Sequence, residues 1–299
     1  MIYPTLLLSS LPNLLATTNF RVMTFNVWDS GTNVENGDDK IIQQIRDVKV
    51  DVYNLQEIQN KTFIKIMEAF PHFDGRQFHV DTCHVATFTK HKIILEHEPI
   101  RRLNVRIRTH IGNEFEIVNM HLQFRDYGPD ILEANPNLTT EELLRLSSQA
   151  HPTRQEEIVR LLNVDWFKRA QKLSWIVPII ITGDFNTPSD LDWQEDTKSR
   201  HHGLVVPWPA TKALEDAGLV DSYRKIHPSP VSDPGITWSP ITNNIPLDRI
   251  DFVFYQSLRL KVKKSFTYTG KGVLTPIPNQ KQNNWPSDHR ALITDFYLL

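Results

Sequence analysis

Apolar and polar positions follow strand and helix periods along most of the chain, and this pattern predicts a mixture of both elements. Residues 20–28 alternate apolar and polar side chains, as a strand with one buried face does. Residues 38–48 carry an apolar stripe at helical spacing behind an acidic first turn. A short strand at 51–57 follows, so the chain begins as a compact strand–helix–strand unit.

The middle of the chain is rich in predicted strands. After a helix near 61–70, alternating runs predict strands at 85–90, 92–98, 102–111 and 114–121. The segment 110–114, which contains a glycine, joins the last two runs and is typical of a hairpin. Residues 123–150 are polar and are expected to form an excursion over the surface. Within this excursion Thr139, with Glu142 three residues on, predicts the start of a short helix.

A second capping signal precedes the most apolar strand. Thr153 and Glu156 have the spacing at which hydroxyl and carboxylate satisfy two free N–H groups at the start of a helix. The amphipathic pattern behind them predicts a helix that continues to Phe167. The apolar run 175–181 follows, and its β-branched residues predict a strand that is buried on both faces.

The remainder of the chain is irregular at first and then rich in strands. A helix is predicted at 211–217, closed by Gly218. Strands are predicted at 235–240, 248–255, 258–268 and 290–297. The chain contains no repeat, no low-complexity segment and no linker that would divide it. We therefore expect a single domain over residues 19–299.

Composition narrows the class of protein. The 299 residues are 40% hydrophobic, which is enough for a large globular core. The net charge of -2 gives no global positive field of the kind that nucleic-acid-binding proteins use. The single cysteine, Cys83, excludes an internal disulfide framework. No apolar run is long enough to span a membrane.

The first residues raise the question of location. Residues 1–18 are apolar and end in small residues, as a secretory signal does, but they lack a basic start and contain Pro12. Two acceptor sequons, at Asn60 and Asn137, would be usable in a secreted protein. We favour a secreted or lumenal location, with the cytoplasm as the alternative.

Polar residues stand where the predicted strands begin or end. Each has a structural explanation by itself: Glu57 as a helix cap, Asp288 as a turn residue, and Asp248 and Asp251 as ion-pair partners of Arg249. Together they suggest a site, because the ends of strands in one sheet meet in space. The full set is Asn26, Glu57, His121, Asp184, Asn186, Asp251, Asp288 and His289.

The chemistry of this set points to phosphoester hydrolysis. Carboxylates and amides without a thiolate cluster suit a hard cation such as Mg²⁺. A histidine with a nearby acid suits proton transfer. A metal, an oriented water and histidine or asparagine donors around an anion together fit phosphoester cleavage. The chain has no phosphate-binding P-loop, no serine nucleophile elbow and no His-Glu-x-x-His motif.

Six short motifs resemble the signature blocks of the endonuclease/exonuclease/phosphatase superfamily, in their usual order. They are 24–28 (TFNVW), 55–57 (LQE), 119–122 (NMHL), 183–186 (GDFN), 249–252 (RIDF) and 287–289 (SDH). Any one block is weak, whereas six in order are specific, and they extend over nearly the whole chain. The resemblance implies a deoxyribonuclease I-like α/β fold, a four-layered sandwich of two packed, mostly antiparallel sheets flanked by helices.

The resemblance also implies a metal site. Glu57 would be the principal ligand of Mg²⁺, with Mn²⁺ as an alternative, and Asn26 and Asp288 would lie close to the metal.

The implied catalytic groups surround that metal. Asp184 would orient or deprotonate the attacking water, and Asn186 would hold a phosphate oxygen. His289, steadied by Asp251, and His121 would stabilise the charged transition state and exchange protons. The general base is left open between Asp184 and the His289–Asp251 pair.

The substrate is left open among several phosphoesters. His121 makes the chain resemble the deoxyribonuclease I, neutral sphingomyelinase and phosphatase branches rather than the apurinic endonucleases. The expected function is a phosphodiesterase-type hydrolase. Alternatives are an endonuclease on DNA or RNA, a sphingomyelinase-like enzyme, or a non-catalytic binding module. The expected partner is a nucleic acid, a phospholipid head group or a small phosphate ester, and the protein is expected to be a monomer without an obligate protein partner. The segments 127–129 and 190–193 either shape the pocket or pack an irregular loop.

Overall fold

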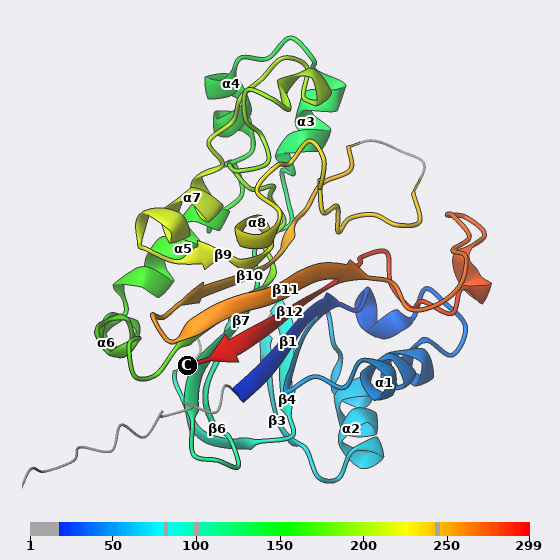
Figure 1. The fold of residues 1–299 in the computed structure, drawn as a ribbon. Coiled ribbons are helices and arrows are strands. Elements are labelled where there is room, and N and C mark those ends of the chain that lie inside the picture. Colours follow the sequence, from blue (N-terminus) through cyan, green and yellow to red (C-terminus); the bar gives the residue numbers. More distant parts are fainter. Residues whose placement is uncertain (1–17, 81–82, 99–101, 243–245) are drawn as a thin grey trace, which may run out of the picture.

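Two six-stranded β-sheets form the centre of the protein (Figure 1). The computed structural model describes residues 18–80, 83–98, 102–242 and 246–299. The first sheet has the strand order β11 (Leu260–Tyr268), β12 (Ala291–Leu298), β1 (Thr18–Asn26), β2 (Val52–Gln56), β4 (Cys83–Thr89) and β3 (Asp74–Val80). The second has the order β5 (Lys92–Glu96), β6 (Arg102–Arg108), β7 (Glu114–His121), β8 (Ile179–Asp184), β10 (Asp251–Gln256) and β9 (Val220–Asp221).

The two sheets pack face to face, and helices cover their outer faces. Side chains of alternate strand residues, such as Val22 of β1 and Ile180 of β8, share one core between the sheets. Helices α1 (Gly37–Val48) and α2 (Asn60–Ala69) pack on the outer face of the first sheet. Helices α5 (Arg154–Asn163), α6 (Asp165–Leu173) and α7 (Pro209–Asp216) cover the second sheet. The predicted four-layered α/β sandwich is therefore confirmed.

The sheets are mixed, with mostly antiparallel pairs. Strands β1 and β2 are parallel, as are β7 and β8, and the other neighbouring strands are antiparallel. The predicted hairpin joins β6 to β7. Both predicted capping boxes are present, at Thr139 with Glu142 and at Thr153 with Glu156. The first starts α4 (Thr140–Leu146), which projects with α3 (Gly128–Ala134) from the sheets at the top of Figure 1.

Three predicted elements differ from the structure. The helix predicted from Thr153 to Phe167 is two helices, because Val164 has extended backbone angles and Asp165 begins a new first turn. The buried strand begins at Ile179 rather than at 175, because Pro178 has no N–H group for the sheet ladder. The predicted strand 235–240 is wrong: only isolated bridges occur there, from Trp238 to two other segments.

Several short elements were not predicted. They are β3, β9, α3 and α8 (Ser222–Ile226). The N-terminal residues 1–17 lie outside the described residues, so the secretory signal stays a prediction. Both sequon residues, Asn60 and Asn137, are exposed. Among the helices that the structure describes, none has the length and apolar character needed to cross a bilayer.

Candidate active site

The topology brings the ends of several strands to one rim. Because β1 and β2 are parallel, Asn26 at the end of β1 and Glu57 directly after β2 lie at the same end of the first sheet. Because β7 and β8 are parallel, His121 lies in register with Asp184. Strand β10 is antiparallel to β8, so its first residue, Asp251, pairs with Asp184. Side chains from two sheets therefore meet at one place.

The segment before β12 completes this rim. Strand β12 is antiparallel to β1, so residues 287–289 return to the end of β1. Ser287 Oγ donates a hydrogen bond to the carbonyl of Asn26 (2.6 Å) and accepts one from the backbone N–H of His289 (2.9 Å). All eight residues that the sequence singled out thus lie around one rim, within two sheets that contact each other.

Glu57 is held by the end of β1 and the turn behind it. Its Oε1 accepts a hydrogen bond from Asn26 Nδ2 (3.0 Å), and its Oε2 accepts one from the backbone N–H of Asp29 (2.8 Å). Helix α2 has no side-chain cap, so the interpretation of Glu57 as a helix cap is wrong. Asn26 Oδ1 accepts from the backbone N–H of Trp28 (2.9 Å), which leaves the Asn26 NH₂ group for the carboxylates.

Asp184 is the centre of the cluster and is almost fully buried. Its Oδ2 accepts from Asn26 Nδ2 (2.9 Å), and its Oδ1 accepts from the backbone N–H of Asn186 (2.8 Å). His121 Nε2 lies 3.6 Å from Asp184 Oδ2 and 3.8 Å from Glu57 Oε1. The Asn186 side chain donates to the carbonyl of Leu122 (3.1 Å). Asp184 therefore contacts groups from both sheets.

The backbone around this cluster adopts conformations that favour glycine. Gly183 has φ +148°, and a Cβ atom there would lie 2.0 Å from the carbonyl oxygen of Met120, so the close approach of β7 and β8 requires glycine. Glu57 and Asn186 have positive φ angles of 59° and 50° although they are not glycines. Such conformations persist where the surrounding structure enforces them, often at functional sites.

His289 and Asp251 form a buried pair. His289 Nδ1 lies 2.9 Å from Asp251 Oδ2, and its Nε2 lies 3.7 Å from Asp184 Oδ2. Burial lowers the pKa of His289, but the charges of Asp251, Asp184 and Asp288 outweigh burial and raise this pKa well above its usual value. Burial raises the pKa of Asp251 to about 6. The surrounding acids therefore favour the protonated imidazole, which donates hydrogen bonds at both nitrogens.

Asp288 has one carboxylate oxygen, Oδ1, that accepts no hydrogen bond and has His289 Nε2 3.9 Å away. Its Oδ2 accepts from Trp238 Nε1 (3.0 Å), whereas its Oδ1 is buried and accepts no hydrogen bond. Burial raises the pKa of Asp288, and the negative charge of Glu57 raises it further. A buried carboxylate oxygen without a donor is unfavourable unless a proton or a cation joins it. The site therefore has a place for positive charge.

One group of three residues has ligand atoms close enough to hold a metal ion. Asp184, Asp251 and His289 each offer an atom within 4.8 Å of the others. Because His289 Nδ1 bonds Asp251 Oδ2, the atoms of this pair that remain for a cation are His289 Nε2 and Asp251 Oδ1, which accepts no hydrogen bond.

These polar groups open into a cleft of about 420 Å³. Its aromatic walls are Trp28, Phe124, Tyr127 and Trp238, and Phe124 is 47% exposed. The volume lies within the range of small-molecule sites. The sequence left open whether the segment 127–129 shapes the pocket or packs a loop. In the structure its Tyr127 is part of the cleft wall.

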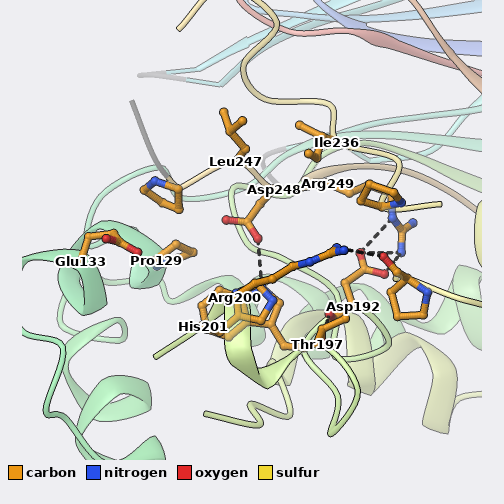
Figure 2. A pocket seen from close by; sticks show the side chains of 14 residues that line it. Pro129, Glu133, Asp192, Thr197, Arg200, His201, Ile236, Leu247, Asp248 and Arg249 are labelled. Atoms are coloured by element: carbon orange, nitrogen blue, oxygen red, sulfur yellow. Dashed lines mark hydrogen bonds and ion pairs between the residues drawn. The ribbon is translucent and has the colours of Figure 1, made fainter. Parts of the chain in front are cut away.

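One structural explanation made Asp248 an ion-pair partner of Arg249, but the carboxylate oxygens of Asp248 (Figure 2) have other partners. Trp193 Nε1 donates to Asp248 Oδ1 (2.9 Å), and Tyr127 OH donates to Oδ2 (3.1 Å). Burial raises the pKa of Asp248 to about 7, although both donors oppose this rise. The expectation that Arg249 pairs with Asp248 and Asp251 is therefore wrong.

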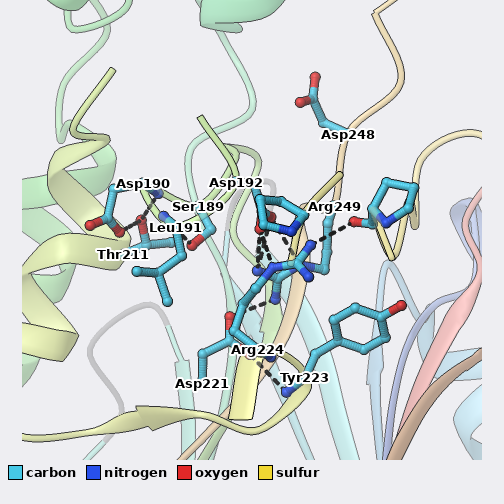
Figure 3. A network of polar contacts seen from close by, with 12 residues as sticks. Ser189, Asp190, Leu191, Asp192, Thr211, Asp221, Tyr223, Arg224, Asp248 and Arg249 are labelled. Carbon is cyan, nitrogen blue, oxygen red and sulfur yellow. Dashed lines mark hydrogen bonds and ion pairs between the residues drawn. The ribbon is translucent and has the colours of Figure 1, made fainter. Parts of the chain in front are cut away.

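Arg249 belongs instead to a buried network of charges (Figure 3). Its guanidinium lies 2.8 Å from Asp192 and 2.6 Å from Asp221, and Arg224 forms an ion pair with the same Asp192. Sequence reasoning did not find Asp221 and Arg224, because they follow no periodic pattern. The nearest signal was the acidic segment 190–193, which supplies Asp192 and Trp193.

Sequence comparison places the chain among known proteins. The model of the endonuclease/exonuclease/phosphatase family matches residues 23–289. An uncharacterized protein from Caenorhabditis elegans is 36% identical over 298 residues, which cover 95% of this chain and 93% of that protein.

Solved structures share the fold at low sequence identity. The TDP2 protein of D. rerio, in complex with a single-strand DNA product, is 13% identical, with a TM-score of 0.59 over 93% of this chain and 99% of that one. Truncated Caenorhabditis elegans TDP2 is 14% identical, with a TM-score of 0.60 over 93% and 97%. A mannosyl-6-phosphatase from Bacteroides thetaiotaomicron is 17% identical, with a TM-score of 0.58 over 93% and 99%.

Proposed function

The chain belongs to the endonuclease/exonuclease/phosphatase family and is therefore a phosphoester hydrolase, and we propose that it is a metal-dependent enzyme of the phosphodiesterase type. The observation that carries this proposal is the convergence of Glu57, Asp184 and His289, from distant parts of the chain, on one cleft. A water, an anion and a cation can all contact polar groups there.

Glu57 and Asp288 would hold the metal, and Mg²⁺ fits them best. The Oδ1 of Asp288, which accepts no hydrogen bond, and the carboxylate of Glu57 are hard oxygen donors, and the cleft leaves room for the waters that Mg²⁺ keeps. Mn²⁺ accepts the same kind of ligands. Once bound, the ion would polarise the phosphoryl group and offset the negative charge of the acids. Asn26, whose NH₂ group bonds Glu57 and Asp184, would keep the two carboxylates in position.

Asp184 would act as the general base. Asn26 and the backbone of Asn186 fix the orientation of its carboxylate, so that it can align a water and accept its proton. The other candidate base, the His289–Asp251 pair, fits less well, because the surrounding acids raise the pKa of His289 and so favour the protonated ring, which cannot accept a proton.

The two histidines would act on the phosphoryl group. His121 Nε2 and His289 Nε2 both lie within 3.7 Å of Asp184 Oδ2, so an oxygen bound next to this carboxylate would meet donors from both rings. Asn186, at the same rim, would contribute a further contact to a non-bridging oxygen. As the water oxygen bonds to phosphorus, the ester P–O bond breaks, and protonated His289 would supply the proton that the leaving alcohol takes.

The names of two structural neighbours support the phosphoester class. One structure contains a single-strand DNA product, and another belongs to a mannosyl-6-phosphatase. A nucleic acid and a sugar phosphate differ in size and charge, but both present a phosphoester bond.

The proposal is tested with a panel of phosphoesters. The purified chain would be incubated with DNA, RNA, sphingomyelin, inositol phosphates, nucleotides and an activated phosphodiester, each with Mg²⁺ and with a chelator. We expect turnover of at least one compound, lost on chelation and restored by excess Mg²⁺. Binding of Mg²⁺ without turnover of any compound would instead support a non-catalytic module.

A further inference from the structure

A second pocket lies behind one wall of the active-site cleft (Figure 2). It has a volume of about 350 Å³. The irregular region between β8 and β10 supplies most of its lining, including Trp193, Arg200, His201 and Asp248, and α3 contributes Glu133. None of the residues that line it is among the eight that the active site uses.

The same two short segments, 236–238 and 248–250, line both pockets. In the segment 248–250, Asp248 faces the second pocket and Ile250 faces the cleft. In the segment 236–238, Ile236 faces the second pocket and Trp238 faces the cleft. In a regular strand, residues two apart point the same way. In these two irregular segments such residues point to different cavities, so the second pocket lies directly next to the active site.

Hydrogen bonds at Asp248 join the two sides of this wall. Its carboxyl group, which lines the second pocket, accepts from Tyr127 OH, and Tyr127 lines the cleft. Trp193, on the floor of the second pocket, donates to the other oxygen of the same carboxyl group. A molecule that contacts Asp248 would therefore lie one hydrogen bond away from the cleft wall.

The second pocket is preformed. Its floor includes Asp192 and Arg249, which belong to the buried network of ion pairs (Figure 3). Arg224 bonds to three backbone carbonyls of the segment 227–234 and so fastens the loop that carries Pro230 and Pro234. A cavity whose walls are already ordered binds a ligand without a large entropic cost.

The lining has the chemistry of a site for a flat, neutral ring. His201 stacks on Trp193 with ring centroids 3.8 Å apart, and burial lowers the pKa of His201 to about 4, so its ring is uncharged at neutral pH. Four proline rings add flat apolar surface: Pro129, Pro230, Pro234 and Pro246.

Hydrogen-bond donors and hydrogen-bond acceptors both surround this apolar surface. Arg200 is a donor, and its guanidinium is held by the carbonyls of Pro230 and Val231. The carboxyl groups of Glu133 and Asp248 provide acceptors: Oε1 of Glu133 lies 2.9 Å from His202 Nε2, which leaves Oε2, and each oxygen of Asp248 accepts one hydrogen bond and can accept a second. Donors and acceptors around a stacking surface match the edge of a heteroaromatic base, since such a ring presents both.

We propose that this second pocket binds a nucleoside-sized ligand through a neutral heteroaromatic ring, which stacks on His201 and bonds at its edge to Arg200, Glu133 and Asp248. The site goes beyond the proposed catalytic function, because it needs neither a metal nor a phosphate group. Its volume suits one nucleoside rather than an oligonucleotide.

Calorimetric titration of the full chain with adenosine, guanosine, cytidine and uridine, in the presence of a chelator, tests the proposal. Nucleosides lack the phosphate group on which the catalytic site acts, and Leu247, which lines the second pocket and not the cleft, distinguishes binding at the two places. We expect at least one nucleoside to bind with a dissociation constant in the millimolar range or below. Leu247→Trp, which places an indole at the pocket mouth, should weaken binding at least tenfold. His201→Ala, which removes the stacking surface, should weaken it by about fivefold or more.

Leu258→Trp is the matched control. Leu258 is 86% exposed and lies outside the pocket, whereas Leu247 is 38% exposed and lines it. The control should bind like the unmodified chain, and equal melting temperatures would show that all variants are folded. Absence of binding by every nucleoside would overturn the proposal, as would binding that Leu247→Trp leaves unchanged or that Leu258→Trp weakens equally. Binding of a simple sugar such as methyl mannoside in place of nucleosides would overturn the assignment of an aromatic ligand.

Discussion

Two clusters of buried charge meet at the short segment 248–251, and they differ in how their charges are matched. In the network of Figure 3, two arginines, Arg224 and Arg249, face two aspartates, Asp192 and Asp221. In the active site the acids Glu57, Asp184, Asp251 and Asp288 are grouped with two histidines and two asparagines. No Lys or Arg is among the described residues that line the cleft.

The difference separates a structural cluster from a functional one. Where every buried charge has an opposite partner, the group satisfies itself and fixes the backbone around it. Where negative groups are in excess, the native state keeps an unfavourable arrangement that a proton, a cation or a substrate can relieve. Asp192 and Asp184 are both buried aspartates, and only the surrounding charges distinguish their roles.

The largest effect is expected from changes of similar size in the active-site cluster, where acids outnumber positive groups; we call it the unbalanced cluster. Asp184→Asn and His289→Gln each remove a group that would move a proton, so we expect the turnover of the best phosphoester substrate to fall by about 10²–10⁴-fold. The melting temperature of Asp184→Asn should stay close to that of the unmodified chain, because this change removes repulsion between acids. His289→Gln leaves Asp251 buried with fewer partners and should lower the melting temperature. Turnover near the original rate in both variants would contradict the proposed mechanism.

A change in the network of Figure 3, where each acid faces an arginine, should affect the stability of the fold. Arg249→Met leaves Asp192 and Asp221 buried with fewer partners, which is expected to cost about 3–5 kcal/mol of unfolding free energy. Urea denaturation measures this cost. Lys212→Met is the control, since Lys212 forms an exposed ion pair with Asp216 (2.8 Å), and the loss of such a pair should leave the unfolding free energy nearly unchanged. Equal costs for the two variants would mean that the network of Figure 3 is not structural.

Added metal should stabilise only the unbalanced cluster. At a concentration about 100 times its dissociation constant, Mg²⁺ is expected to add about 2.7 kcal/mol to the unfolding free energy. Glu57→Gln should abolish most of this gain, which thermal denaturation with Mg²⁺ and with chelator would detect. The control Glu195→Gln changes an exposed acid away from the cleft and should keep the full gain. A gain that survives in Glu57→Gln would place the ion elsewhere.

The smallest effect is expected at Asp248, which lies between the two clusters. Burial raises the pKa of Asp248 to about 7 in the folded state, above the ordinary value of about 3.9 in the unfolded state. At pH values between these two pKa values, Asp248 therefore binds fewer protons in the unfolded chain than in the folded chain. The stabilising contribution of this group is fully present below the unfolded pKa and is lost as the pH rises through about 7.

Over the pH unit below 7, this group should lower the unfolding free energy by about 1 kcal/mol. Urea denaturation at several pH values measures the slope. Asp248→Asn should flatten it, because the amide keeps the shape of the carboxyl group and does not titrate. A slope that is identical in the variant would show that Asp248 does not titrate in this range.

Local signals in the sequence predicted the helices better than the irregular regions. The capping boxes at Thr139 and Thr153 were right because hydroxyl and carboxylate three residues apart interact within one turn. The apolar stripe of α1 was right because it repeats at the helical period. The strand expected at 235–240 was wrong because a ladder requires a partner strand, and Trp238 finds only single bridges.

The sequence by itself determined the two-sheet fold and the set of polar residues at the strand ends. Apolar periodicity and the order of the six motifs are properties of consecutive residues, so they are visible before folding. The tertiary structure decided the partners of those polar residues: Asp248 bonds Tyr127 and Trp193, Arg249 pairs with Asp192 and Asp221, and Asp288 accepts a hydrogen bond from Trp238 at one oxygen only. These pairings join segments with no periodic relation in sequence, and they exist only because two sheets and an irregular region pack against each other.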